Sequence, residues 1–135
     1  MSWDIVNPRG QPSGWNDGML APTGGRVLFV AGQTGRDASG RVPASGFAAQ
    51  FGQALANVLE VLEAAGAGPA DVGRMTIYVT DLAAYRASRK ELAAIWQAKM
   101  GKHYPATALL EVKGLVDENA VVEIEATAVV PAWKR

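Results

Sequence analysis

The sequence predicts a single α+β domain in which two helices cover one face of a β-sheet. Residues 44–65 and 82–100 carry apolar side chains at spacings of three and four, the pattern of helices with one buried face. Strand-like runs rich in aliphatic and β-branched residues precede, separate and follow these two segments. The 135 residues are enough for one hydrophobic core, so residues 1–135 are taken as one domain.

Composition excludes several classes of function. Lys and Arg together number 13, as do Asp and Glu, so the net charge is zero and nothing in it favours nucleic-acid binding. The absence of cysteine excludes disulfides and a cysteine nucleophile, and a single histidine predicts no metal site. No apolar run approaches the roughly 18 residues that span a bilayer, and the N-terminus lacks the pattern of a signal peptide. A cytoplasmic protein without membrane partners is expected.

The N-terminal third contains two expected strands around a loop. Residues 3–6 form the first strand, and the Pro- and Gly-rich residues 7–14 form the loop. Trp15 follows. Its bulk favours anchoring of the loop on the core or at an interface, and the alternative is stacking on a ligand. Residues 26–33 are almost continuously apolar, which predicts a strand buried on both faces.

The two helices have recognisable ends. Ser45 is the expected N-cap of the helix at 44–65, and Gly66 ends it. A strand is expected at 74–80. Asp81 then caps the second helix, expected over 82–100 as one piece and ended by Gly101.

The last third contains two strands joined by a loop, at 104–112 and from residue 121. The second strand alternates strictly, with Val122, Ile124, Ala126 and Ala128 on one face and Glu123, Glu125 and Thr127 on the other. Glu111, Glu123 and Glu125 are acid–base carboxylates, ligands of a hard metal ion, or members of a solvated face. Spacing supports neither of the first two, and composition alone favours the solvated face. His103 is expected at the surface or an interface, and whether Trp133 docks on the core is left open.

Two helices with one packed face each cover only one side of a sheet. The other side then meets water or another subunit. The apolar run at 27–31 favours a subunit, and near-zero net charge is compatible with self-association.

Several separated segments together resemble the Rid family, also known as the YjgF-like or L-PSP endoribonuclease-like family. These are residues 30–35 (VAGQTG), 53–59 (QALANVL), 62–66 (LEAAG), 79–82 (VTDL), 104–106 (YPA) and 122–126 (VEIEA). The resemblance extends over nearly the whole chain. It implies a chorismate mutase-like fold with a mixed sheet, assembled as a homotrimer with clefts between subunits.

The resemblance also implies a chemistry. Members of the family hydrolyse reactive enamines and imines, such as 2-aminoacrylate, to a 2-keto acid and ammonia without a metal or organic cofactor. An arginine that follows Pro-Ala grips the substrate carboxylate in a bidentate manner. A glutamate and a backbone carbonyl hold the attacking water, and an aromatic residue from the first loop closes the cleft.

Transferred to this chain, the resemblance makes Glu123 the catalytic glutamate and Leu109 the source of the backbone group. Trp15 lies near the position of the loop aromatic, and Ala31 stands where the deaminases often have serine. The main departure is Thr107, which occupies the arginine position and carries no charge. Arg89 is the strongest candidate for a replacement cation, although a solvent-facing helix arginine is its simpler interpretation.

Three functions remain open at this stage. The first is a hydrolase for an imine or related C–N bond. Its substrate would differ from 2-aminoacrylate, because Thr107 cannot form the bidentate contact that an arginine makes with a carboxylate. The second is a non-catalytic trimer that binds a small metabolite. The third, an endoribonuclease or translation inhibitor, is disfavoured by the balanced charge and the single histidine.

Overall fold

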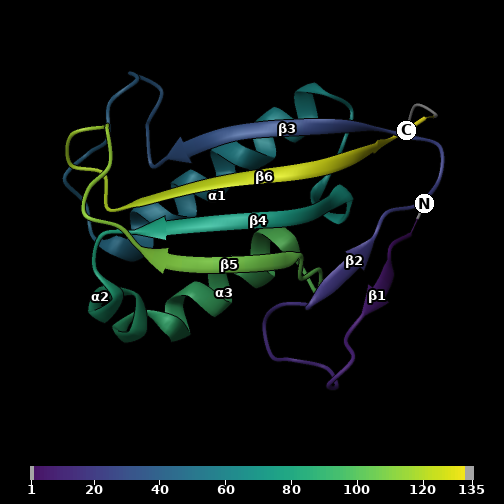
Figure 1. Ribbon diagram of the computed structural model, residues 1–135. Helices are drawn as coiled ribbons and strands as arrows, with labels where there is room; N and C mark the ends of the chain where they lie inside the picture. Colours follow the sequence, from purple (N-terminus) through teal and green to yellow (C-terminus); the bar gives the residue numbers. More distant parts are fainter. Residues whose placement is uncertain (1, 133–135) are drawn as a thin grey trace.

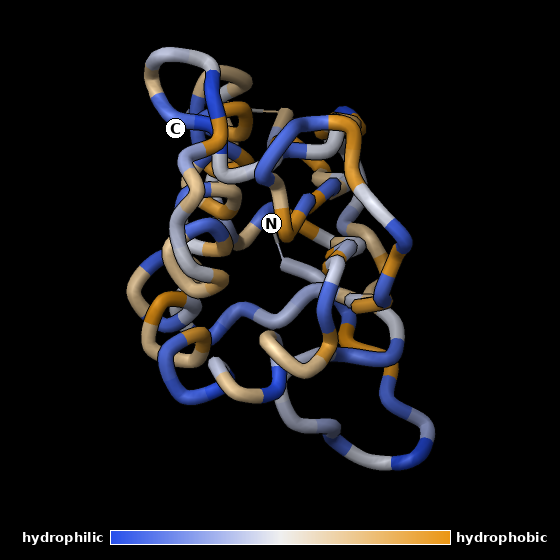
Figure 2. The backbone as a smooth tube through the Cα atoms, turned by 90° about the vertical axis from the view of Figure 1, so that its left-hand side faces the viewer, coloured by the Kyte–Doolittle hydropathy of each residue, from blue (hydrophilic) through white to orange (hydrophobic). Residues whose placement is uncertain are grey.

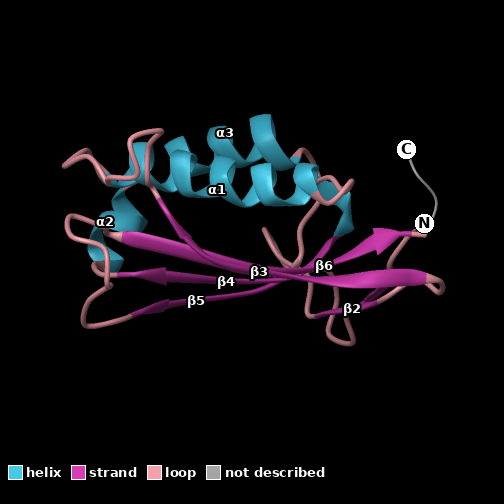
Figure 3. Cartoon of the chain, turned by 90° about the horizontal axis from the view of Figure 1, so that it is seen from above, coloured by secondary structure: helices cyan, strands magenta, loops and turns pink. Residues whose placement is uncertain are grey.

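The computed structural model describes residues 2–132 as one four-stranded mixed sheet with helices on one face, together with a small two-stranded sheet (Figure 1, Figure 3). The strand order is β3-β6-β4-β5, in which only β4 and β5 run parallel. The elements are β1 (Asp4–Val6), β2 (Gly18–Leu20), β3 (Gly25–Thr34), α1 (Phe47–Ala64), the short 3-10 helix η1 (Pro69–Asp71), β4 (Val72–Val79), α2 (Leu82–Ala87), α3 (Arg89–Met100), β5 (Ala106–Glu111) and β6 (Val122–Pro131). The predicted α+β class, with a mixed sheet covered on one side, is confirmed.

Strand β6 is central and follows its predicted alternation. Val122, Ile124 and Ala128 are completely buried against the helices, whereas Glu123 and Glu125 lie on the opposite face. Its neighbours β3 and β4 are both antiparallel to it. Period-two patterning therefore assigns the two faces of this strand correctly.

Helix α1 packs its apolar stripe onto the sheet. Phe51, Leu55, Val58 and Leu62 are at most 3% exposed. The coils of the tube in Figure 2 carry both hydrophobic and hydrophilic segments, as amphipathic helices do. Gly66, with φ of 80°, follows the last turn as predicted.

The predicted N-cap of α1 is wrong. Gly46 occupies that position and no side chain caps the helix. The hydroxyl of Ser45 instead contacts the Pro43 carbonyl at 3.5 Å. The buried Gln50 stabilises this end, because its amide nitrogen donates to the carbonyls of Ser45 and Asn119, at 3.3 and 2.9 Å.

The second helix is broken where one continuous helix was expected. Asp81 caps α2 as predicted, accepting from the amides of Ala83 and Ala84. Ser88 separates α2 from α3, and its hydroxyl donates to the Ala84 carbonyl at 2.9 Å. Serine that bonds back to a carbonyl four residues earlier bends helices, which accounts for the break.

The prediction that residues 26–33 are buried on both faces is also wrong for a single chain. Strand β3 is at the edge of the sheet, and the face opposite the helices carries no covering layer from residues 2–132 (Figure 3). Val27 and Phe29 are 57% and 79% exposed on that face. A subunit that covers this face remains a prediction.

A hairpin that was not foreseen joins the N-terminus to the sheet. Residues 18–20 form β2, which pairs antiparallel with β1. The indole N–H of Trp3 donates to the Ala70 carbonyl at 2.9 Å, and the Trp3 ring leaves no room for a Cβ atom at Gly73. Trp133 lies outside the described residues. No helix within residues 2–132 is long and apolar enough to cross a membrane.

Candidate functional site

A cavity of about 810 Å³ opens beside β5, between this edge strand, the α2–α3 segment and the loop that carries Trp15. Its walls come from five separated parts of the chain. They comprise Ser13, Gly14, Trp15, Phe51, Ile77, Leu82, Tyr85, Arg86, Arg89, Leu92, Ala93, Trp96, Gln97, Tyr104, Thr107 and Leu109. We refer to this cavity as the β5 pocket. It contains four of the six side chains predicted from the sequence: Trp15, Arg89, Thr107 and Leu109.

Thr107 and Leu109 reach the pocket because β5 presents alternate residues to the helix side. They lie opposite Met75 and Ile77 of the parallel neighbour β4, whose side chains are buried. The Thr107 hydroxyl donates to the Pro105 carbonyl at 2.9 Å. It can still accept a hydrogen bond, but it supplies no positive charge to a ligand.

Trp15 stands at the mouth of the pocket with 44% of its surface exposed. Its indole N–H donates to the Asp17 carboxylate at 3.3 Å. The favoured interpretation placed Trp15 on the core or at an interface. The core of this chain does not bury it, and an interface remains a prediction.

The next residue, Asn16, was missed in the sequence and fixes this loop. It is 7% exposed. Its side-chain nitrogen donates to the Tyr104 carbonyl at 2.7 Å, and its side-chain oxygen accepts from Asn7 and Gln11 at 2.8 and 3.0 Å. Its backbone N–H donates to the Pro105 carbonyl at 3.3 Å. Asn16 thus joins the Trp15 loop to the start of β5.

Two arginines line the pocket, where the sequence analysis singled out one. The guanidinium carbon of Arg89 lies 5.8 Å from the ring centre of Tyr85, within the range of a cation–π contact. Arg86 is one turn earlier and also lines the pocket. Among residues 2–132, the only ion pair joins Arg36 to Asp117, so neither pocket arginine is paired with a carboxylate.

Aromatic contacts hold the far wall of the pocket in place. The rings of Trp96 and Tyr104 are stacked, with centroids 6.2 Å apart and an angle of 5° between the planes. The Trp96 N–H donates to the His103 carbonyl at 3.1 Å. His103 is half-buried and its Nε2 lies 2.6 Å from the Val72 carbonyl, so it supports this wall from within the fold.

Glu123 and Ala31 lie elsewhere. Glu123 is opposite Tyr78 of β4 and Thr34 of β3, on the face of the sheet turned away from the helices. A Cβ atom at Gly32 would collide with the Glu123 carboxylate. A side chain at position 32 would therefore displace the carboxylate where it crosses β3, at the irregularity between Val30 and Gln33. Ala31 is exposed beside it and its carbonyl accepts from the Gln33 side chain.

The carboxylates on this open face contribute to a raised pKa of Tyr78. Partial burial raises the pKa of the Tyr78 hydroxyl, and the charges of Glu125 and then Glu123 raise it further. The phenol consequently remains a neutral hydrogen-bond donor at neutral pH. Glu111 is not part of this group, because its carboxylate accepts from the Leu82 amide at 2.9 Å and so supports the start of α2.

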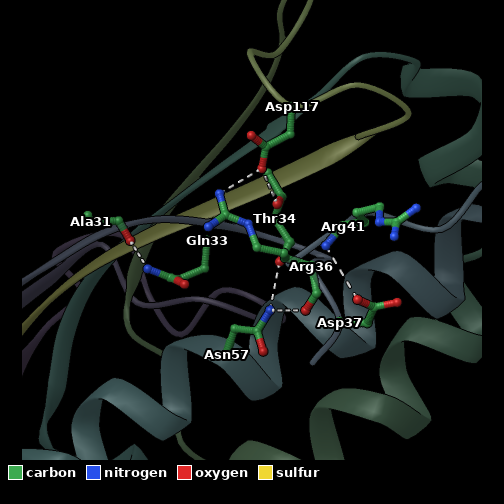
Figure 4. A network of polar contacts seen from close by, with 8 residues as sticks. All are labelled: Ala31, Gln33, Thr34, Arg36, Asp37, Arg41, Asn57 and Asp117. Carbon is green, nitrogen blue, oxygen red and sulfur yellow. Dashed lines mark hydrogen bonds and ion pairs between the residues drawn. The ribbon is translucent and has the colours of Figure 1, made fainter. Parts of the chain in front are cut away.

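A separate polar network ties the loop before β6 to β3 (Figure 4). Asp117 accepts from the Thr34 hydroxyl at 2.7 Å and from Arg36 at 3.0 Å. These two hydrogen bonds, the Thr34 bond first, lower the pKa of Asp117. The Asn57 amide nitrogen donates to the carbonyls of Thr34 and Arg36. This network joins structural elements and is distinct from the β5 pocket.

No group of three or more potential ligand side chains within residues 2–132 is arranged to hold a metal ion. The candidate site thus consists of an aromatic pocket with two arginines on one face of the sheet and a half-buried glutamate on the other face.

The protein is thus an α+β domain with a mixed sheet. A pocket lies on the helix side at β5, the edge strand that is parallel to β4, and Glu123 lies on the open face. Residues 14–130 match the Endoribonuclease L-PSP family, and the chain belongs to that family. The resemblance to the Rid family is confirmed.

Relatives of this chain include RutC family proteins and imine deaminases. A RutC family protein of Haemophilus influenzae is 31% identical over 130 residues, which cover 96% of this chain and 98% of the relative. The human and bovine 2-iminobutanoate/2-iminopropanoate deaminases are 30% and 33% identical over 105 residues, covering 77% of this chain and 73% of each relative.

Solved structures agree. The structure of YyfB from Yersinia pestis, described as a protein of unknown function of the conserved Rid protein family, superposes with a TM-score of 0.83 at 34% identity. It covers 96% of this chain and 100% of its own. RidA from Psychrobacter gives a TM-score of 0.67 at 27% identity, with coverage of 92% and 94%.

Proposed function

We propose that this protein hydrolyses a reactive imine or enamine, with Glu123 as the general base. The observation that carries the proposal is the half-buried Glu123 carboxylate, which lies directly over Gly32, where a Cβ atom would displace it. Its neighbour Tyr78 is a neutral hydroxyl donor. The similarity to 2-iminobutanoate/2-iminopropanoate deaminases over 77% of the chain supports this class of reaction.

The proposed reaction consumes one water. Glu123 accepts a proton from the water as its oxygen forms a bond to the imine carbon. Glu123 returns this proton to the nitrogen, which gives a carbinolamine. The hydroxyl proton of the carbinolamine then passes to the nitrogen through Glu123 as the carbon–nitrogen bond breaks, and a ketone and ammonia leave. An enamine enters the same sequence after protonation at carbon gives the imine.

The β5 pocket and Glu123 lie on opposite faces of the sheet, so the proposed cleft combines the pocket of one copy with Glu123 of another. The exposed Val27, Phe29 and Leu110 on the open face support such self-association. We propose a homotrimer, the assembly implied by the Rid resemblance. Each copy would then contribute to two clefts.

Thr107 sets a limit on the substrate. A desolvated arginine–carboxylate pair is worth about 2–5 kcal/mol when one partner is removed. Thr107 cannot supply that interaction, and its hydroxyl proton is already directed to the Pro105 carbonyl. The proposed substrate is therefore not 2-aminoacrylate, unless another cation of the pocket holds its carboxylate.

The decisive experiment compares Glu123→Gln with Glu125→Gln, a matched change two residues along the same face. Imines are generated in place by an amino-acid oxidase, and the rate of ammonia release is measured with and without the protein. We expect wild type and Glu125→Gln to accelerate release and Glu123→Gln to lose the acceleration by about 10²-fold or more. Equal rates for wild type and Glu123→Gln would overturn the proposal.

A mixing experiment tests the shared cleft. Glu123→Gln and the double variant Arg86→Ala/Arg89→Ala, both expected to be inactive by themselves, are unfolded together and refolded. If the cleft combines two copies, mixed assemblies contain intact clefts and activity returns. Failure to recover activity, in mixtures shown by mass spectrometry to contain both variants, would place the whole site within one chain.

A non-catalytic metabolite-binding trimer is the second candidate, favoured by the uncharged Thr107 in the pocket. It predicts a ligand that binds saturably in the pocket and is released unchanged. Cleavage of RNA remains a distant third, and it would require the steeply salt-dependent RNA binding that a chain with zero net charge gives no reason to expect.

A further inference from the structure

The β5 pocket has an unbalanced charge. Arg86 and Arg89 line it, and its lining contains no aspartate or glutamate. Neither arginine is in an ion pair among the residues that the structure describes. Two guanidinium groups at one rim, without a carboxylate partner, make this rim attractive to an anion.

Two carboxylates beside α2 accept hydrogen bonds from its backbone amides rather than from the arginines. Asp81 accepts from the backbone amides of Ala83 and Ala84, at 2.9 and 3.3 Å. Glu111 accepts from the Leu82 amide at 2.9 Å. Both carboxylates thus bind the first turn of α2, and a ligand anion has no internal competitor that is already bound to Arg86 or Arg89.

Five of the other fourteen residues that line the pocket are aromatic. Trp15, Phe51, Tyr85, Trp96 and Tyr104 all border the cavity. Several are fixed by contacts among themselves and with Phe47, which lies edge-on to Tyr85 with ring centroids 6.4 Å apart. A wall that is already ordered loses little conformational entropy when a flat ligand group lies against it.

The size of the pocket favours a ligand with a large apolar group. About 810 Å³ lies within the range of pockets that hold drug-sized ligands. A small aliphatic imino acid would leave most of the aromatic surface in contact with water. Burial of a phenyl or indole group would use that surface.

We propose that the β5 pocket binds an organic anion that carries an aromatic group, with its carboxylate held by Arg86 and Arg89 and its ring against the aromatic wall. The inference rests on the proposed hydrolysis and names its substrate class, the imine of an aromatic 2-amino acid. The corresponding product is an aromatic 2-oxo acid. The two arginines would replace, from α2 and α3, the cation that Thr107 does not provide.

Binding of the product separates recognition from catalysis. The probes are phenylpyruvate, pyruvate and phenethylamine, each titrated calorimetrically into the intact assembly. Phenylpyruvate has both the ring and the carboxylate, pyruvate lacks the ring, and phenethylamine carries the opposite charge. We expect phenylpyruvate to bind at least about tenfold more tightly than either of the others, from burial of the ring and from the two cations.

Variants locate the interaction. Arg86→Ala/Arg89→Ala should weaken phenylpyruvate binding by at least about tenfold, and Arg86→Lys/Arg89→Lys should retain part of it. Lys90→Ala is the matched control, because it removes a neighbouring exposed cation of α3 that does not line the pocket. Unchanged circular dichroism and melting temperature establish that each variant is folded.

The outcomes are distinct. Equal affinity for phenylpyruvate and pyruvate, or binding that survives loss of both arginines, would overturn the inference, as would a pocket filled by a second copy that excludes the probe. Tight phenylpyruvate binding without any imine turnover would support the inference and contradict the proposed hydrolysis. Turnover of aliphatic imines alone, without aromatic binding, would leave the hydrolysis and overturn the substrate class.

Discussion

The two faces of the central sheet differ in how fully a single chain covers them. On the helix side, β5 borders a pocket whose aromatic wall, arginines and loop are held by contacts within the chain. On the open side, Glu123 sits over Gly32 beside exposed apolar residues such as Phe29. The pocket and the Glu123 carboxylate therefore belong to different faces of the sheet and are formed by different residues. Residues 2–132 provide no layer that covers the open face (Figure 3).

The largest effect is expected from Gly32→Ala on the open face. The added methyl group collides with the Glu123 carboxylate and must displace it, while the β5 pocket is untouched. We expect a loss of hydrolytic rate of about 10²-fold or more, comparable to that of Glu123→Gln. Gly114→Ala is the control, because a Cβ atom there meets nothing. A fully active Gly32→Ala would mean that the position of Glu123 does not matter for the reaction.

The next effect concerns the proposed trimer. Phe29→Asp places a charge on the exposed apolar part of the open face, and a charge buried in an interface costs several kcal/mol. We expect dissociation into smaller species in sedimentation velocity experiments. Val116→Asp changes an apolar side chain that is 99% exposed in a loop and should leave the assembly intact. An undisturbed assembly in the Phe29→Asp variant would show that this face meets water.

A smaller effect is expected on the pocket side from Asn16→Ala. The substitution removes the bond to the Tyr104 carbonyl and the acceptor for Asn7 and Gln11. Loss of these buried hydrogen bonds should lower the free energy of unfolding by about 1–3 kcal/mol in urea denaturation. Gln53→Ala, which removes an exposed helix amide, should change it by less than about 0.5 kcal/mol. Equal stability of the two variants would indicate that Asn16 does not hold the loop.

The smallest effect concerns the pH dependence of stability at Asp117. Its pKa is lowered by Thr34 and then Arg36, so folding favours the ionised form. The resulting stabilisation is fully present above the ordinary pKa of 3.8 and is lost as the pH falls through the lower value of the folded state. The advantage of wild type over Asp117→Asn in unfolding free energy should therefore shrink below pH 3.8.

The matched variant for this measurement is Glu118→Gln, an exposed neighbour. Its difference from wild type should not follow the same pH dependence. The effect at Asp117 is a fraction of a kcal/mol, since Arg36 is more than half exposed. An advantage that persists unchanged to the lowest pH at which the protein folds would contradict the assignment.

The sequence by itself determined the features that depend on local periodicity and capping. The alternation of β6, the apolar stripe of α1, the Asp81 cap and the glycine after α1 all follow from neighbours within a few residues. The separated segments that resemble the Rid family are also local, and they identified the family. The sequence did not decide between Ser45 and Gly46 as the N-cap of α1. It also did not reveal the bond from Ser88 to the Ala84 carbonyl, which separates α2 from α3.

Only the tertiary structure decided which face each site residue occupies. Thr107 and Glu123 both belong to alternating strands, but their relative faces depend on the registers of β5 and β6 with β4. The β5 pocket likewise joins Trp15, Arg86 and Tyr104 from distant parts of the chain. The physical reason is that register and packing are set by contacts between residues far apart in sequence, which periodicity within one segment does not encode.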